Sequence, residues 1–164
     1  MPENLEDVCT RIDGLTIQNL ELMEEKISTC IQMEQLLRDG HIELAKTRYI
    51  RGKESFGILQ VPAEDRQMTS LFDLETTITK NGNNIIPHFD ITLKDQENSK
   101  ELFQDPIKWF GVLVPQNLKV AQKRFQTSLS LSVQMANVQS KIAVAMNEIE
   151  CLKILKNNLL IQEE

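Results

Sequence analysis

The stretch "LSVQMANVQSKIAVAMNEIECLKILKNNL", residues 131–159, decides the fold. Its apolar side chains recur at alternating steps of three and four residues, which predicts a helix with one apolar stripe of the coiled-coil kind. Lys156 is the one polar residue in a frame that otherwise consists of Leu131, Met135, Val138, Ile142, Ala145, Ile149, Leu152 and Leu159. Such a helix requires a partner stripe, because most helical stability comes from tertiary packing.

A matching stripe lies near the amino-terminal end of the sequence. It comprises Leu5, Val8, Ile12, Leu15 and Leu22, with Asn19 in the remaining slot. The frame then slips and apolar residues resume at Ile27, Cys30, Ile31, Leu37 and Leu44, which predicts a stutter or a broadened face. Gly40 predicts a break before residue 41. A second helix is expected to begin near Pro115, whose fixed φ suits a first helical position.

Residues 5–48 and 116–160 are nearly equal in length, so each can bury the stripe of the other by folding back. Between them the pattern changes, because six of the eight aromatic residues lie in 50–115. The predicted fold is mainly α: an antiparallel coiled-coil helical hairpin with a small α+β head between the two long helices. The predicted division is a first arm at 1–49, a head and connector at 50–115, and a second arm at 116–164.

A β-hairpin is expected inside the head, in "LETTITKNGNNIIPHFDITL", residues 74–93. β-branched runs flank Asn81-Gly82, a dipeptide that favours a tight turn between two strands. Pro87 cannot donate to a strand ladder, so it confines the second strand to an edge. The polar residues 94–101 are expected to form a loop.

The residue pattern argues against catalytic, metal and cofactor sites. The sequence contains no nucleophile elbow and no paired-carboxylate motif, and neither His41 nor His88 has a metal ligand at the required spacing. Gly52 and Gly57 have the spacing of a phosphate loop, but Ile58 and Leu59 stand where that loop needs Lys and Ser or Thr. We therefore expect no enzyme activity, no cofactor and no metal.

Charge and hydropathy limit the partners. A net charge of −6 and a pI near 5.1 argue against nucleic-acid binding, which needs a clustered basic surface. The longest apolar run, 109–114, is far shorter than the roughly 20 residues of a membrane span. The first residues lack the layout of a signal peptide, and three scattered cysteines fit a reducing compartment. We expect a protein of the cytosol or of a cytosolic membrane face.

Two segments allow two interpretations each. "QDPIKWFGVLVP", residues 104–115, has prolines that end any helix, so residues 109–114 are expected to run extended or to turn at Gly111. This apolar patch is either a core segment or a partner groove anchored by Trp109 and Phe110. "KTRYIRGK", residues 46–53, is either a solvated helix end or a contact for an anionic headgroup or acidic partner.

Two blocks carry a resemblance. "DGHIELAKTRYIRGKESFGILQ", 39–60, and "FQDPIKWFGVLVPQNLKVAQKRF", 103–125, resemble the paired signature of the vacuolar proton-ATPase assembly factor family of the coiled-coil domain-containing protein 115 type. The second block includes Leu118, Ala121, Gln122 and Phe125 among its matching residues. Residues 61–102 match poorly. The partner-binding residues that the resemblance implies are Leu44, Lys46, Arg48, Tyr49, Gly52, Gly57, Asp105, Pro106, Trp109, Phe110, Gly111, Leu113 and Pro115.

The resemblance implies a non-enzymatic chaperone for the membrane-embedded, proton-translocating sector of the vacuolar-type ATPase, which supports organelle acidification. Its implied partners are an integral membrane assembly partner at the endoplasmic reticulum and membrane-sector subunits of the pump, so that membrane association is peripheral and through partners. The implied location is the cytosolic face of the endoplasmic reticulum, with endosomal or intermediate-compartment membranes as further locations.

Three alternatives stay open, of which a structural vesicle-tethering coiled coil would normally need longer arms. A prefoldin-like holdase also joins two coiled-coil arms through a β-containing tip, and it predicts a hetero-oligomer of small chains with broad affinity for unfolded proteins. An enzyme with an unrecognised site in the head predicts turnover that is lost when one polar head residue is changed.

Overall fold

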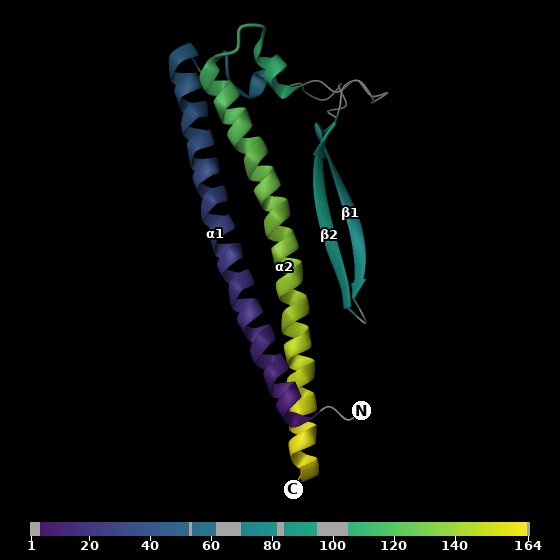
Figure 1. Ribbon diagram of the computed structural model, residues 1–164. Coiled ribbons are helices and arrows are strands. Elements are labelled where there is room, and N and C mark those ends of the chain that lie inside the picture. Colours follow the sequence, from purple (N-terminus) through teal and green to yellow (C-terminus); the bar gives the residue numbers. More distant parts are fainter. Residues whose placement is uncertain (1–3, 53, 62–69, 82–83, 95–104, 164) are drawn as a thin grey trace. The chain divides into compact units, whose positions relative to one another are not determined.

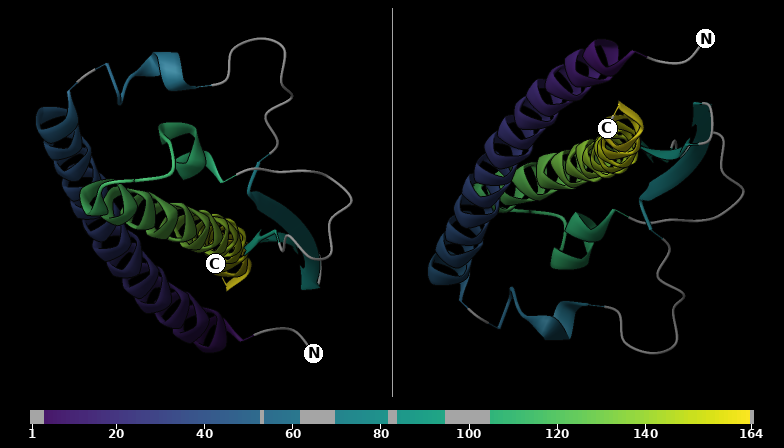
Figure 2. Two further views of the ribbon diagram at one scale, coloured as in Figure 1. Left: turned by 90° about the horizontal axis from the view of Figure 1, so that it is seen from above. Right: turned by 90° about the horizontal axis from the view of Figure 1, so that it is seen from below.

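The computed structural model describes residues 4–52, 54–61, 70–81, 84–94 and 105–163 (Figure 1). It is mainly helical, with a two-stranded sheet between two long helices in chain order, so the predicted fold class is confirmed. In order, the elements are α1 (Leu5–Arg51), η1 (Ile58–Gln60), β1 (Phe72–Asn81), β2 (Asn84–Leu93), η2 (Pro106–Phe110) and α2 (Gln116–Glu163). Both long helices appear as continuous ribbons in the two end-on views (Figure 2).

The chain forms two compact units, and each unit contains parts of both long helices and of the hairpin. The first unit comprises residues 1–30, 76–88 and 134–164, and the second comprises residues 31–75 and 89–133. The predicted division into a first arm, a head and a second arm therefore stays a prediction.

Within each unit α1 and α2 run antiparallel. In the first unit Arg11 pairs with Glu148, and Lys26 further along α1 reaches Gln139, which lies earlier in α2. In the second unit Asp39 pairs with Arg124. Exposed ion pairs of this kind contribute well under about 1 kcal/mol each. They add little to the stability of the helix pair, and their main effect is to favour one register of α1 against α2. Neither long helix has a stretch apolar enough to cross a bilayer within the part of the chain that the structure describes.

The inward face of α1 keeps one frame along the whole helix. Its buried and half-buried positions alternate at three and four residues through Leu5, Val8, Ile12, Leu15, Asn19, Leu22, Lys26, Thr29, Met33, Leu36, Gly40, Glu43 and Thr47. The predicted stutter is wrong, because Ile27 and Ile31 point outward and are 61% and 59% exposed.

Two buried threonines fit this frame because their hydroxyls find hydrogen-bond partners. The Thr29 and Thr47 hydroxyls donate to the carbonyls of Glu25 and Glu43, one turn earlier, at 2.8 and 2.9 Å. A buried hydroxyl that is satisfied in this way costs little, whereas an unsatisfied one costs about 1–3 kcal/mol. This inward face of α1, which we call the seam, therefore continues through Thr29 and Thr47, although neither residue is apolar.

Gly40 does not break α1, which contradicts the prediction. It is buried in the seam, where the ring of Phe125 from α2 lies against its backbone. A Cβ atom at this position would lie 2.9 Å from Phe125 Cε1, closer than carbon atoms approach in packed interiors. Gly40 is therefore required for close packing and not for a turn.

Gly40→Ala is expected to destabilise the protein by about 1 kcal/mol, because overpacking of about 1–3 kcal/mol exceeds the helix-propensity gain of about 1 kcal/mol. Gly14→Ala is the matched control, since nothing lies within 4 Å of its added Cβ, and it should stabilise by about 0.5–1 kcal/mol. Urea unfolding followed by circular dichroism measures both. Equal stabilisation by the two substitutions would contradict the close approach of Phe125.

Asn19 is a polar residue of the seam in the first unit. Its Oδ1 atom is buried and accepts no hydrogen bond within the described residues. Asn19→Leu is expected to raise the free energy of unfolding by about 1–3 kcal/mol, because it removes a buried acceptor without a partner and adds apolar contact. Thermal unfolding measures the change, and a lowered melting temperature would instead indicate that the amide has a partner.

The hairpin has two strands of ten residues each, which together contain the predicted segment 74–93 except for residues 82–83. Asn81 of the predicted Asn81-Gly82 turn is the last residue of β1, whereas Gly82 and most of the predicted polar loop, 95–101, lie outside the described residues. Pro87 lies in β2, as predicted, and the missing N–H is tolerated because each strand of a two-stranded sheet has a free edge. At the other end of the hairpin the Lys94 backbone N–H donates to the Leu71 carbonyl at 2.9 Å.

Candidate partner-binding site

The end of α1 is fixed by a glycine cap. Gly52 has φ of +85°, and its N–H donates to the Arg48 carbonyl at 2.9 Å, a common way to end a helix. The Arg48 side chain then reaches forward, and its Nε donates to the Phe56 carbonyl at 3.1 Å. The segment that follows α1 is thereby held against the last turn of the helix, with Phe56 only 4% exposed.

Asp105 organises the segment before α2. Its Oδ1 accepts the Ile107 N–H at 3.0 Å and the Gln122 Nε2 at 2.6 Å, so it caps η2 and ties it to α2. Pro106 occupies the start of η2, where a missing N–H costs nothing. Trp109 and Phe110 complete this short helix, so of the two alternatives for residues 109–114 the extended one is wrong.

An aromatic stack joins the two signature blocks. The rings of Phe56 and Phe110 lie 5.3 Å apart at an interplanar angle of 15°. Trp109, Phe110 and Val114 are half-buried. Gly111, with φ of +96°, turns the chain out of η2, as one of the two predictions stated. The apolar patch 109–114 therefore contributes to packing on one side and is exposed on the other.

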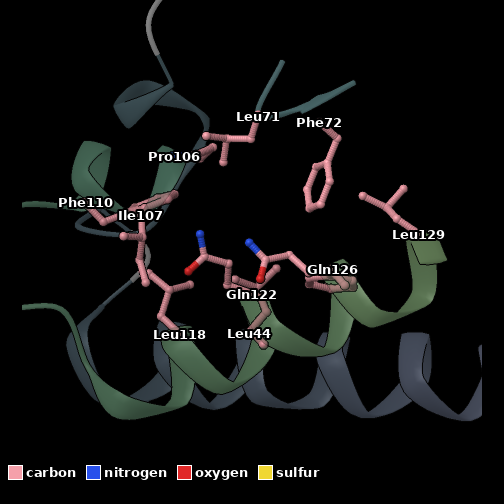
Figure 3. Close-up of a pocket in the computed structure, with 12 residues that line it drawn as sticks. Leu44, Leu71, Phe72, Pro106, Ile107, Phe110, Leu118, Gln122, Gln126 and Leu129 are labelled. Atoms are coloured by element: carbon pink, nitrogen blue, oxygen red, sulfur yellow. The ribbon is translucent and has the colours of Figure 1, made fainter. Parts of the chain in front are cut away.

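An apolar cavity of about 260 Å³ lies beside this stack (Figure 3). Among the described residues, the polar side chains in its wall are those of Gln122 and Gln126. The rest of the wall comes from α1, the start of β1, η2 and α2: Leu44, Leu71, Phe72, Pro106, Ile107, Phe110, Leu118, Ala121, Phe125 and Leu129. Apolar walls with a few polar groups are typical of binding pockets.

A second, shallower groove lies where α1 ends and α2 begins. Its lining residues are Ile42, Ala45, Lys46, Tyr49, Ile50 and Asn117. Lys46 pairs with Glu43 at 2.6 Å, and Tyr49 is 92% exposed. The groove therefore combines a basic side chain with apolar surface that the described residues leave uncovered.

All thirteen predicted partner-binding residues fall in the second unit, but in different settings. Leu44, Pro106 and Phe110 line the cavity, and Lys46 and Tyr49 line the groove. Trp109 is half-buried, and Leu113 is 83% exposed. The others shape or cap the backbone around these surfaces: Arg48, Gly52, Gly57, Asp105, Gly111 and Pro115. Their role in partner binding stays a prediction.

Several cavity residues were not among the predicted site residues. Leu118, Ala121 and Phe125 follow helical spacing inside the second matching block, and this was a signal that could have placed them on one face. Leu71 and Phe72 carried no such signal, because they lie in the poorly matching region. Within the described ranges, no group of three or more His, Cys, Asp or Glu residues could hold a metal ion.

The fold and the site define a class: a helical-hairpin protein whose second unit exposes apolar surface in a cavity and a groove. The predicted resemblance is confirmed, since the chain is similar to the Vma22/CCDC115 family, whose model matches residues 90–128. A protein of Danio rerio named vacuolar ATPase assembly protein VMA22 is 29% identical over 83% of this chain and 84% of its own length. Proteins of that name from Homo sapiens and Mus musculus are each 27% identical, over 83% and 80% of this chain and 86% and 83% of their own lengths.

Asp105→Ala is expected to destabilise the second unit by about 1–2 kcal/mol, because it removes both the cap of η2 and the bond to Gln122. Asp90→Ala is the control, since Asp90 is an exposed carboxylate that accepts a hydrogen bond from the backbone N–H of its neighbour Ile91. Trp109 fluorescence during urea unfolding measures the stability next to η2. A similar loss in both variants would contradict the capping role of Asp105.

Proposed function

We propose that this protein is a non-enzymatic assembly factor for the vacuolar-type ATPase. The observation that carries the proposal is similarity over about four fifths of the chain to relatives named vacuolar ATPase assembly proteins. Those names describe assembly and not catalysis, which supports a role exerted by binding alone.

The proposed client is the membrane-embedded, proton-translocating sector of the pump, before it joins the catalytic sector. The protein would act on the cytosolic face of the endoplasmic reticulum together with an integral membrane partner, and so support organelle acidification. Endosomal or intermediate-compartment membranes are further proposed locations. These finer statements rest on the family resemblance of the two signature blocks.

The proposed contact surface is the apolar cavity of the second unit. Two features support this assignment. The cavity is walled by side chains from both signature blocks, including Leu44 and Phe110, and its opening exposes apolar groups that gain free energy when covered. Leu129 lies in the cavity wall and is 43% exposed, so a partner that enters the cavity would bury it.

The test is affinity purification of the tagged protein from gently solubilised membranes, followed by quantitative mass spectrometry. We expect enrichment of membrane-sector subunits of the vacuolar-type ATPase with an integral membrane protein, and without the catalytic peripheral sector. Recovery of mainly small coiled-coil chains and assorted unfolded proteins would overturn the proposal in favour of a prefoldin-like holdase.

Leu129→Lys is expected to lower the recovery of these subunits by about tenfold or more, because a Leu buried by a partner contributes about 1.5–3 kcal/mol. Leu160→Lys is a matched control, since Leu160 lies on the same helix and is 42% exposed. Both variants should unfold at nearly the wild-type temperature. Unchanged recovery with Leu129→Lys would exclude the cavity as the contact surface.

A further inference from the structure

The loop that connects η2 to α2 displays two apolar side chains. Val112 is 99% exposed and Leu113 is 83% exposed. The preceding residues explain why, since the stacked Phe110 anchors η2 while Gly111, with positive φ, turns the chain outward. Both side chains therefore project from a fixed base, and Figure 2 shows this short connection leading into the first turn of α2.

More apolar surface lies at the same end of the second unit. Tyr49 and Ile50, in the last turns of α1, are 92% and 64% exposed. They line the groove together with Asn117 of the first turn of α2, which begins just after the loop. We call Tyr49, Ile50, Val112 and Leu113 the tip. Exposed apolar residues that gather in this way mark a site of interaction.

The charge around the tip is opposite to that of the rest of the chain. Residues 42–61 and 105–123 contain seven basic and three acidic residues, whereas the whole chain carries −6. Two of the three acidic side chains already have partners, since Glu43 pairs with Lys46 and Asp105 accepts the Ile107 N–H at the start of η2. The exposed bases Arg51, Lys108 and Lys119 are thus left with little local opposition.

We propose that the tip docks directly on an anionic lipid bilayer. Val112 and Leu113 enter the boundary between headgroups and acyl chains, Tyr49 lies at headgroup depth, and the surrounding Lys and Arg side chains contact lipid phosphates. The chemistry fits each layer of the bilayer: exposed apolar residues for the interface, an amphipathic aromatic at its edge and a basic rim for the negative surface. A loop that projects two apolar side chains can insert them into the headgroup region of a bilayer without a matching pocket, which a protein partner would have to provide.

This inference goes beyond the proposed function, in which partners alone bring the protein to membranes, and it does not rest on it. It is tested with the purified full chain and no other protein. Vesicles of phosphatidylcholine, with or without phosphatidylserine, are floated through a density gradient and the bound fraction is measured. We expect binding to the anionic vesicles that falls at least about tenfold when salt is raised to 0.5 M, because several basic residues take part.

Trp109 reports on the tip directly, because it is the only tryptophan and lies three residues before Val112. On anionic vesicles its emission is expected to shift to shorter wavelength and to be quenched by lipids brominated near the headgroup. Binding to vesicles without any change in Trp109 emission would overturn the assignment, since another surface would then make the contact.

Val112→Ser combined with Leu113→Ser should lower vesicle binding at least about fivefold, as expected when interfacial apolar residues are lost. Leu160→Ser combined with Ile161→Ser is the control, because it replaces another adjacent apolar pair, 42% and 72% exposed, on the last turns of α2. Val112→Ser alone separates the two proposals, as Val112 is not among the predicted partner-binding residues. No binding to anionic vesicles, together with loss of co-purifying proteins in the Val112→Ser variant, would make the tip a protein interface and overturn the proposal.

Discussion

The seam that α1 presents to α2 is the constraint on which the other features depend. Inward residues of α1 are spaced alternately by three and four positions, and this spacing determines which side chains pack against α2. The apolar residues at the other positions of α1 are left exposed to solvent or to a partner. In the first unit the frame is filled mainly by Leu5, Val8, Ile12 and Leu15 from α1, with Val138, Ile142 and Ile149 buried on α2. In the second unit the frame passes through Gly40, Glu43 and Thr47, and close packing there depends on Phe125 reaching the Gly40 backbone.

The sequence was sufficient to predict the two helices, their antiparallel pairing and the two strands, because each has a long periodic signal. It misplaced the second half of the α1 seam for a physical reason. The apolar pattern points to Ile27 and Ile31 as inward residues, whereas the helix keeps its frame and places the half-buried Lys26 and the buried Thr29 on its inward face. Lys26 bonds to Gln139 on α2 and the Thr29 hydroxyl donates to the Glu25 carbonyl one turn earlier, and no hydropathy pattern reveals either bond.

The candidate site was predicted in part. The second block pointed to the right region, since Asp105 and Gln122 are joined and Phe110 stacks on Phe56 from the other block. These contacts join segments far apart in the sequence, and they give a structural reason for Asp105, Gln122, Phe56 and Phe110 at their positions. The cavity could not be predicted, because Leu71 and Phe72 reach its wall through tertiary folding and not through spacing along the chain. Pro106 was misread because a proline that ends one helix can equally begin another.

The two halves of α1 use their apolar residues differently, and this difference bears on function. In the last turns the inward positions are polar or small, while Ile42, Tyr49 and Ile50 face outward. A helix pair gains less from such a seam, so packing within the chain gives no reason to keep these apolar side chains at the surface. A surface that costs solubility and contributes little to the fold is retained when something else covers it. The same argument applies to Val112 and Leu113, whose exposure is enforced by an anchored η2 and a glycine turn. The second unit thus combines polar and small inward residues on α1 with exposed apolar residues at the end of α1 and in the loop before α2, and this combination supports the proposed role in binding other components.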